Sequence, residues 1–155
     1  MLNTTLCYIE DTDKKKILLL HRNKKEKDLN EGKWVGVGGK FEAGETADEC
    51  LLREVYEETG LTLTDYYLAG VIRFESDKYE AEDMYLYYAT GFTGDLLTDT
   101  AEGELHWVDK DKVLTYPTWE GDIKFLIPLF EGKRNLKMLV RYEGDNLAEF
   151  KDYSK

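Results

Sequence analysis

The segment 39–61 restricts what this chain can fold into more than any other part of it. The two glycines at its start, Gly39 and Gly44, allow a close backbone approach and a positive φ. After them, apolar residues recur at helical spacing: Ala47, Cys50, Leu51 and Val55. The segment therefore predicts a glycine loop followed by an amphipathic helix, which starts at Thr46 or Glu45 and ends at Gly60.

The far end of this helix carries three glutamates on one face, Glu54, Glu57 and Glu58. Like charges three or four residues apart cost a helix about 0.2–0.5 kcal/mol per pair, and folding gains nothing obvious from that cost. A hard divalent cation such as Mg²⁺ or Mn²⁺ would remove it, because these ions prefer oxygen ligands. The carboxylates are therefore candidate metal ligands, and one of them could instead be a general base. The competing interpretation is a solvated acidic helix face.

The remaining hydrophobic pattern predicts strands that alternate with two helices. Strands are expected at 2–10, 16–21, 33–36, 62–74 (with a break near Asp65), 84–90 and 104–108, with a terminal hairpin at 136–142 and 147–152. A second helix is expected over 119–130, kinked or short because it contains Pro128. The segment 23–33 is expected to be a charged loop. This order predicts an α/β fold with a mixed central sheet.

Length and composition fit one domain over residues 1–155. The chain has no apolar run of about 18 residues and no basic start followed by an apolar stretch, so we expect neither a membrane span nor a secretory signal. Cys7 and Cys50 are expected to be buried thiols in a reducing cytoplasm.

A net charge of −11 argues against binding to a nucleic acid backbone. A small anionic substrate stays possible, because metal ions and local cations can neutralise it.

The segment 39–61 also resembles the Nudix box at each fixed position of that motif. The matching residues are Gly39, Glu45, Arg53, Glu54, Glu57, Glu58 and Gly60, with Val55 and Leu61 at the aliphatic positions. The Nudix family hydrolyses nucleoside diphosphates linked to another group, with Mg²⁺ or Mn²⁺ as the cofactor, and folds as an α/β/α sandwich. The order of the expected strands and helices fits that sandwich over the whole chain.

The resemblance implies a set of metal ligands and substrate contacts. The implied metal ligands are Glu54, Glu57, Glu58 and the carbonyl of Gly38. Some family members have an additional glutamate near the metals, for which Glu102 is the first candidate and Glu104 the second. Gly39, Lys40 and Arg22 are candidate substrate contacts. The two cations among them suit phosphates, although each could equally be an ordinary surface charge.

Arg53 is the cation of the motif helix. Its spacing alone allows it to pair with Glu49 or Glu57, each four residues away. The resemblance implies instead that Arg53 pairs with Glu45 and orients a catalytic carboxylate. We therefore place Arg53 in the catalytic centre and Glu45 beside it as a supporting residue.

Two further segments resemble enzymes that remove oxidised purine nucleotides, most closely the bacterial MutT/MutX-type 8-oxo-dGTP diphosphatases. The segment 30–40, which contains Trp34 as a candidate substrate contact, resembles their lead-in to the box. The segment 117–122 resembles their second specificity segment. The resemblance implies that Trp119 stacks on the base and that Asp122 hydrogen-bonds its edge. The competing interpretation of Trp119 is a core anchor of the second helix.

Two positions depart from the animal enzymes of this kind. Val35 stands where they have an asparagine, and Gly121 stands where they have the first of two adjacent acids. Both departures remove polar contacts to the base.

The sequence as a whole predicts a Mg²⁺-dependent hydrolase, a monomer or homodimer, that converts 8-oxo-dGTP to 8-oxo-dGMP and pyrophosphate. One alternative is a Nudix hydrolase of a nucleotide sugar, a dinucleoside polyphosphate or a pyrimidine triphosphate. The other is a module that senses a nucleotide without cleaving it. The chain retains every carboxylate of the box, whereas such modules usually lose some of them, so the sequence favours an enzyme.

Overall fold

The computed structural model describes residues 1–23, 32–98 and 100–154, which form nine strands, two α-helices and a 3₁₀-helix. The strands are β1 (Leu2–Asp11), β2 (Lys16–His21), β3 (Trp34–Val35), β4 (Val37–Lys40), β5 (Thr62–Ser76), β6 (Glu82–Thr93), β7 (Glu104–Asp109), β8 (Leu136–Glu143) and β9 (Asn146–Asp152). The helices are α1 (Ala47–Thr59), η1 (Lys110–Thr115) and α2 (Glu120–Phe130). Most of the charged loop predicted over 23–33 lies outside the described residues.

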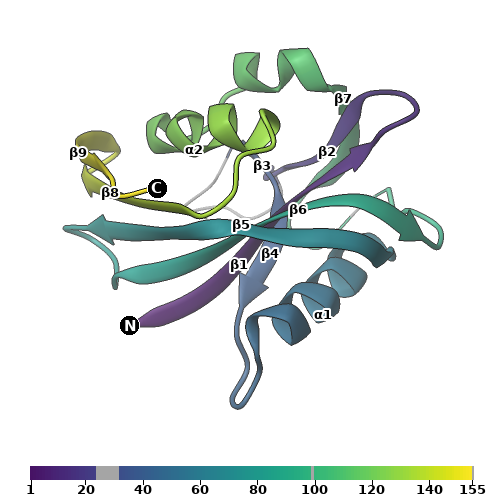
Figure 1. Cartoon of the computed structure of the whole chain (residues 1–155), viewed down its shortest axis with the longest axis horizontal. Helices are drawn as coiled ribbons and strands as arrows, with labels where there is room; N and C mark the ends of the chain where they lie inside the picture. Colours follow the sequence, from purple (N-terminus) through teal and green to yellow (C-terminus); the bar gives the residue numbers. More distant parts are fainter. Residues whose placement is uncertain (24–31, 99, 155) are drawn as a thin grey trace.

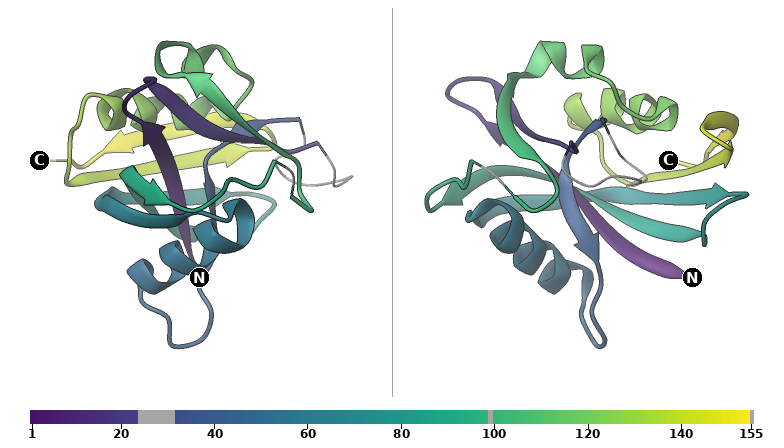
Figure 2. Two further views of the ribbon diagram at one scale, coloured as in Figure 1. Left: turned by 90° about the vertical axis from the view of Figure 1, so that its right-hand side faces the viewer. Right: turned by 180° about the vertical axis from the view of Figure 1, so that it is seen from behind.

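The strands form one mixed sheet with β1 near its centre. The main path runs β3-β2-β1-β6-β5-β8-β9, with β4 paired to β1 and β7 paired to β2. The β1–β6 and β5–β8 pairs are parallel, and the other pairs are antiparallel. Helix α1 covers one face of the sheet, and α2 and η1 cover the other (Figures 1 and 2). The predicted α/β/α sandwich with a mixed sheet is confirmed.

Strand β1 contributes to a hydrophobic cluster on each face of the sheet, because successive side chains point to opposite faces. Cys7 and Ile9 belong to the cluster that contains Leu51 of α1. Tyr8 belongs to the cluster that contains Phe125 of α2. All of these side chains are almost completely buried, and each large one stabilises the fold by about 1.5–3 kcal/mol.

Both ends of α1 are set by local residues. The Thr46 side chain accepts from the backbone N–H of Glu49, and the Glu49 carboxylate accepts from the backbone N–H of Thr46. Gly60 ends the helix with a φ of 79°. The last turn has no basic residue and carries Glu57 and Glu58, which the helix dipole disfavours there. These two carboxylates therefore reduce the stability of the helix that presents them.

Two local predictions were wrong. Gly38, Gly39 and Lys40 were expected in a loop, but they belong to β4, which pairs with β1. A Cβ atom on Gly38 would collide with the carbonyl of Thr5 on β1, so this glycine serves close strand pairing. The turn comes later, at Gly44, where φ is 79°. The helix η1 was not predicted.

The other expectations about the elements were met. Helix α2 is short and ends two residues after Pro128, and β8 and β9 form the terminal hairpin. The break near Asp65 is a shift in the β5–β6 register. Cys7 and Cys50 are both buried and unbridged. Among the described residues, no helix has the length and apolar character needed to cross a membrane.

Candidate active site

Helix α1 meets β4 through the carboxylates of its second half. A Cβ atom on Gly39 would lie 2.6 Å from each oxygen of the Glu54 carboxylate, so only glycine leaves room for that group. The backbone of Gly38 lies close enough to the Glu58 carboxylate to lower its pKa. The two glycines of β4 therefore form the surface against which two of the proposed metal ligands lie.

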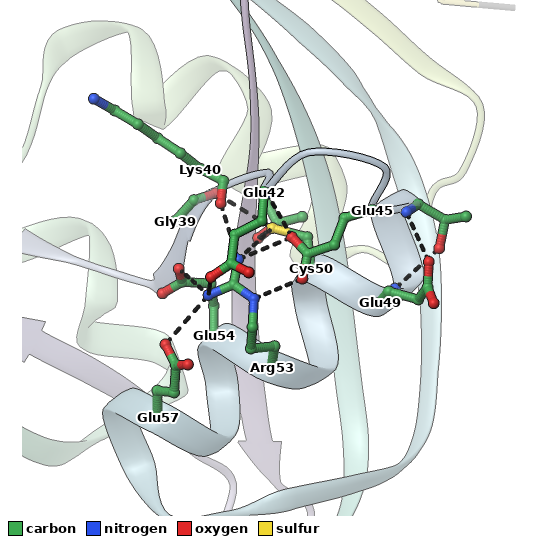
Figure 3. A network of polar contacts seen from close by, with 11 residues as sticks. Gly39, Lys40, Glu42, Glu45, Glu49, Cys50, Arg53, Glu54 and Glu57 are labelled. Atoms are coloured by element: carbon green, nitrogen blue, oxygen red, sulfur yellow. Dashed lines mark hydrogen bonds and ion pairs between the residues drawn. The ribbon is translucent and has the colours of Figure 1, made fainter.

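The guanidinium of Arg53 lies among the carboxylates of the box (Figure 3). Its Nε is 2.6 Å from Glu45 Oε2, and its Nη1 is 2.8 Å from Glu54 Oε1 and 3.2 Å from Glu57 Oε2. Its Nη2 also donates to the carbonyl of Lys40 at 3.0 Å. The pKa of Glu45 is lowered to about 2, with the hydrogen bond from Arg53 as the largest cause and the hydrogen bond from the backbone N–H of Glu42 as the next.

The contacts of Arg53 agree with the pairing implied by the sequence resemblance. Glu45 is its shortest partner, and Glu57 is also within reach. The pairing with Glu49 that helical spacing allows is not seen; this carboxylate caps the start of α1 instead. Arg53 thus joins the turn before α1 to the acidic end of the helix.

Three carboxylates repel one another deeper in the site. The pKa of Glu58 is raised to about 8, first by burial and then by the charges of Glu102 and Glu54. Burial also raises the pKa of Glu54. The Oε2 atom of Glu58 is buried and has no hydrogen-bond partner among the described residues. Arg22 lies 3.5 Å from Glu102 and moderates the negative charge there.

This arrangement fits a divalent cation by charge and by donor chemistry. A buried carboxylate oxygen without a hydrogen-bond donor is costly, and a hard cation is the partner that such an oxygen prefers. In the described ranges, no three acidic, histidine or cysteine side chains are close enough together to form a ready-made coordination shell. Glu54 and Glu57 are instead turned toward Arg53. Arg53 contacts one oxygen of each, Glu54 Oε1 and Glu57 Oε2, so the second oxygen of each carboxylate is the one that could ligate a metal beside Glu58.

The two candidates for an additional glutamate face different surroundings. Glu102 is close enough to Glu58 to raise its pKa. The Glu104 carboxylate accepts from the Asn23 side chain at 3.3 Å and lies 3.8 Å from His106. The position of Glu102 suits the role better.

A pocket of about 200 Å³ opens between the sheet and the start of α2. Seven of the predicted site residues line it: Arg22, Gly38, Gly39, Lys40, Glu58, Trp119 and Asp122. They come from the end of β2, from β4, from α1 and from the start of α2, which are far apart in the sequence. The fold therefore joins the acidic end of α1 to the second specificity segment in one cavity.

Comparison with known proteins identifies the family. The model of the NUDIX domain matches residues 2–129. The protein belongs to the Nudix hydrolase family.

Relatives of known sequence and structure agree with this assignment. An uncharacterised Nudix hydrolase, YvcI of Bacillus subtilis, is 32% identical over 83% of this chain and 79% of its own length. An oxidized purine nucleoside triphosphate hydrolase of Danio rerio is 32% identical over 82% of this chain and 81% of its own length. The crystal structure of a MutT protein from Bacillus halodurans superposes with a TM-score of 0.88 at 29% identity, covering 99% of this chain and 98% of the other.

In this Nudix enzyme, Trp119 is both a core residue and a wall of the pocket. The side chain is 8% exposed, and its ring meets the ring of Tyr142 edge-on with the centroids 5.0 Å apart. Lys33 Nζ lies 4.6 Å from the Trp119 ring centroid. The two interpretations of Trp119 from the sequence are therefore compatible, because one face of a large indole can pack while another lines a cavity.

Asp122 lies in the first turn of α2 and has few polar partners. The Thr118 hydroxyl donates to its Oδ2 at 2.9 Å. Burial raises the pKa of Asp122 to about 7, while Thr118 and the charge of Lys33 act in the opposite direction. Near neutral pH this side chain is able to donate a hydrogen bond as well as accept one.

Trp34, a candidate substrate contact from the sequence, is not among the residues that line this pocket. Its ring stacks on His21 with centroids 4.2 Å apart and meets Tyr116 edge-on at 4.8 Å. The neighbouring Val35 lines the pocket instead. Adjacent residues of a strand point to opposite faces, so only one of the two can reach the cavity.

Sequence reasoning missed the floor of the pocket, which is made by the sheet. The unpredicted lining residues include Thr4, Leu6, Ile72, Phe74, Glu82, Met84 and Val140. Alternation within each strand indicates which residues share a face, but the sequence does not show which strands lie side by side.

The structure also explains why position 121 is a glycine. A Cβ atom there would lie 2.6 Å from the hydroxyl oxygen of Tyr142, and that hydroxyl accepts from the backbone N–H of Gly121 at 2.7 Å. The Tyr142 side chain thus occupies the space that a side chain at position 121 would need. Asp122 is left as the acid of this segment that lines the pocket.

Proposed function

We propose that this Nudix hydrolase cleaves purine nucleoside triphosphates, with 8-oxo-dGTP as the preferred substrate and Mg²⁺ or Mn²⁺ as the cofactor. The observation that carries the proposal is the shared cavity. Glu58 and Lys40 line it from the catalytic side, and Trp119 and Asp122 line it from α2. A nucleotide needs both kinds of surface, since its phosphates are anionic and its base is flat and apolar with a polar edge.

Each phosphate-side residue has a role in the proposed reaction. Arg22 and Lys40 bind phosphate oxygens. A divalent cation would be held by the box carboxylates Glu54, Glu57 and Glu58, the carbonyl of Gly38, and Glu102. There it would neutralise charge on the phosphates and lower the pKa of water. Arg53, held by Glu45, positions the first two box carboxylates.

The proposed reaction is attack of water on the β-phosphorus. The bond between the β-phosphorus and the oxygen that bridges it to the α-phosphorus breaks, and the nucleoside monophosphate keeps that oxygen. One of the box glutamates takes the proton of the water. The products are a nucleoside monophosphate and pyrophosphate.

The substitution Glu57→Gln tests the chemistry. It removes one carboxylate charge without changing the shape of the side chain, so we expect pyrophosphate release from 8-oxo-dGTP to be abolished while circular dichroism shows an intact fold. Glu42→Gln is the matched control, because Glu42 is another exposed carboxylate near Arg53, at 3.5 Å, but is not a proposed ligand. Unchanged turnover by Glu57→Gln would refute the assigned site.

A substrate panel tests the specificity. Formation of the nucleoside monophosphate with Mg²⁺ is measured for 8-oxo-dGTP, 2-hydroxy-dATP, dGTP, dCTP, UDP-glucose and ADP-ribose, because cleavage of the last two releases neither pyrophosphate nor phosphate. We expect kcat/KM for 8-oxo-dGTP to exceed that for dGTP by at least about tenfold. A flat profile, or a preference for a diphosphate sugar, would retain the Nudix chemistry and reject the substrate.

A further inference from the structure

Glu82 is an acidic residue in the floor of the pocket that the proposed reaction does not use. It lies at the start of β6, opposite Leu2 of β1 and Phe74 of β5 in the sheet register. Its side chain lines the cavity together with those of Met84 and Phe74. It therefore belongs to the floor of the pocket, whereas Asp122 belongs to the helix above it.

One oxygen of the Glu82 carboxylate is held in place. The Thr4 hydroxyl donates to Oε2 at 2.7 Å. Thr4 is only 8% exposed, so its hydroxyl has little access to water as an alternative partner. Among the described residues, Glu82 forms no other hydrogen bond or ion pair, which leaves Oε1 available to a molecule in the pocket.

Because the surroundings of Glu82 are apolar, a hydrogen-bond donor on the ligand should raise its affinity for the pocket. Ile72, Phe74 and Met84 line the same part of the sheet. A carboxylate beside apolar side chains gains from a hydrogen-bond donor, and a ligand that offers none loses affinity. An ionised carboxylate is an acceptor only, so the ligand must carry the protons.

We infer that Glu82 determines base specificity by accepting hydrogen bonds from the amino edge of a guanine base, an inference that rests on the nucleotide hydrolysis proposed above. Guanine carries an N1–H and a 2-amino group side by side, so both can donate to one carboxylate. Hypoxanthine lacks the 2-amino group. Adenine places the lone pair of N1 beside its amino group, and a carboxylate repels that lone pair.

Binding of monophosphates without metal tests the role of Glu82 separately from hydrolysis. Calorimetry on the wild type is expected to show 8-oxo-dGMP binding at least about tenfold more tightly than 8-oxo-dIMP, because one charged hydrogen bond is lost with the 2-amino group. In Glu82→Gln the ratio is expected to fall close to one, because the new amide group presents a donor. The affinity ratio is also expected to fall close to one in a second variant, Glu82→Ala, which deletes the acceptor.

The control is Glu80→Gln, since Glu80 is an exposed carboxylate near Glu82 that pairs with the N-terminus at 2.9 Å and does not line the pocket. Its ratio is expected to match the wild type. Equal ratios for the wild type and Glu82→Gln, or no binding of either monophosphate, would overturn the inference. Failure of the wild type to hydrolyse any nucleoside triphosphate would instead refute the proposed function, and the binding ratio would still report on Glu82.

Discussion

Asp122 shows how burial changes the chemistry of one side chain. Its pKa is raised from 3.8 to about 7, with burial as the largest cause. Unfolding exposes the carboxyl to water, where its pKa returns to about 3.9. Between these two values the folded protein holds a proton that the unfolded protein has lost. The contribution of this group to stability is therefore fully present below about pH 4 and is lost as the pH rises to about 7.

We predict that Asp122→Asn removes this pH dependence. Between about pH 5 and about pH 8, the free energy of unfolding of the wild type should fall by about 2 kcal/mol relative to that of the variant. Urea denaturation of both proteins without metal at several pH values measures the difference. Parallel stability curves over this range would show that Asp122 titrates normally in the folded protein.

Single residues also show where sequence reasoning ends. The pairing of Arg53 with Glu45 was implied by the motif, and the structure contains it at 2.6 Å. Whether Trp34 or Val35 lines the pocket depends on which face of a two-residue strand meets the cavity. No local pattern fixes that for so short a strand. Glu82 was missed for a similar reason, because its role depends on the neighbouring Thr4 of another strand.

At the scale of elements, the contact between β4 and α1 positions the site. Gly39 of β4 leaves space for the Glu54 carboxylate of α1. The nearest atoms to a methyl group there belong to the end of the flexible Glu54 side chain, which can turn away at little cost to the fold. The same movement would take a proposed metal ligand out of position.

We predict that Gly39→Ala lowers kcat/KM by at least about 100-fold, because small displacements of catalytic groups have effects of that size. The change in unfolding free energy should stay below about 1 kcal/mol.

Gly44→Ala is the contrasting variant. Gly44 has a φ of 79° with no atom near its Cβ position, so alanine there should cost about 1 kcal/mol of stability and leave activity unchanged. Steady-state kinetics and thermal denaturation of both variants separate the two effects. A fully active Gly39→Ala enzyme would contradict the proposed role of Glu54.

The elements differ in how well the sequence predicts them. Helix α1 was placed correctly because its cap, its apolar stripe and its final glycine all agree. Strand β4 was missed because Gly38 and Gly39 indicate a loop locally, while pairing with β1 makes them a strand. The order of strands in the sheet depends on long-range packing, so the floor of the pocket could not be predicted.

At the scale of the whole molecule, negative charge must be balanced at the site. The chain carries a net charge of −11, and Glu54, Glu58 and Glu102 lie close enough together for their charges to oppose one another's ionisation. Without a cation, their repulsion opposes folding. A ligand that binds the folded state alone stabilises it by about 2.7 kcal/mol when its concentration is 100 times its dissociation constant.

We predict that saturating Mg²⁺ raises the Tm of the wild type by about 5 °C or more, and that EDTA reverses the rise and abolishes hydrolysis. In Glu58→Gln the rise should fall by more than half, because the buried oxygen that has no hydrogen-bond partner in the described structure is part of the changed group. General screening of a protein with a net charge of −11 would also raise Tm, so KCl at matched ionic strength is the control. Equal shifts with KCl and MgCl₂ would show that Mg²⁺ acts through its ionic strength alone. Equal Mg²⁺ shifts in the wild type and Glu58→Gln would remove Glu58 from the metal site.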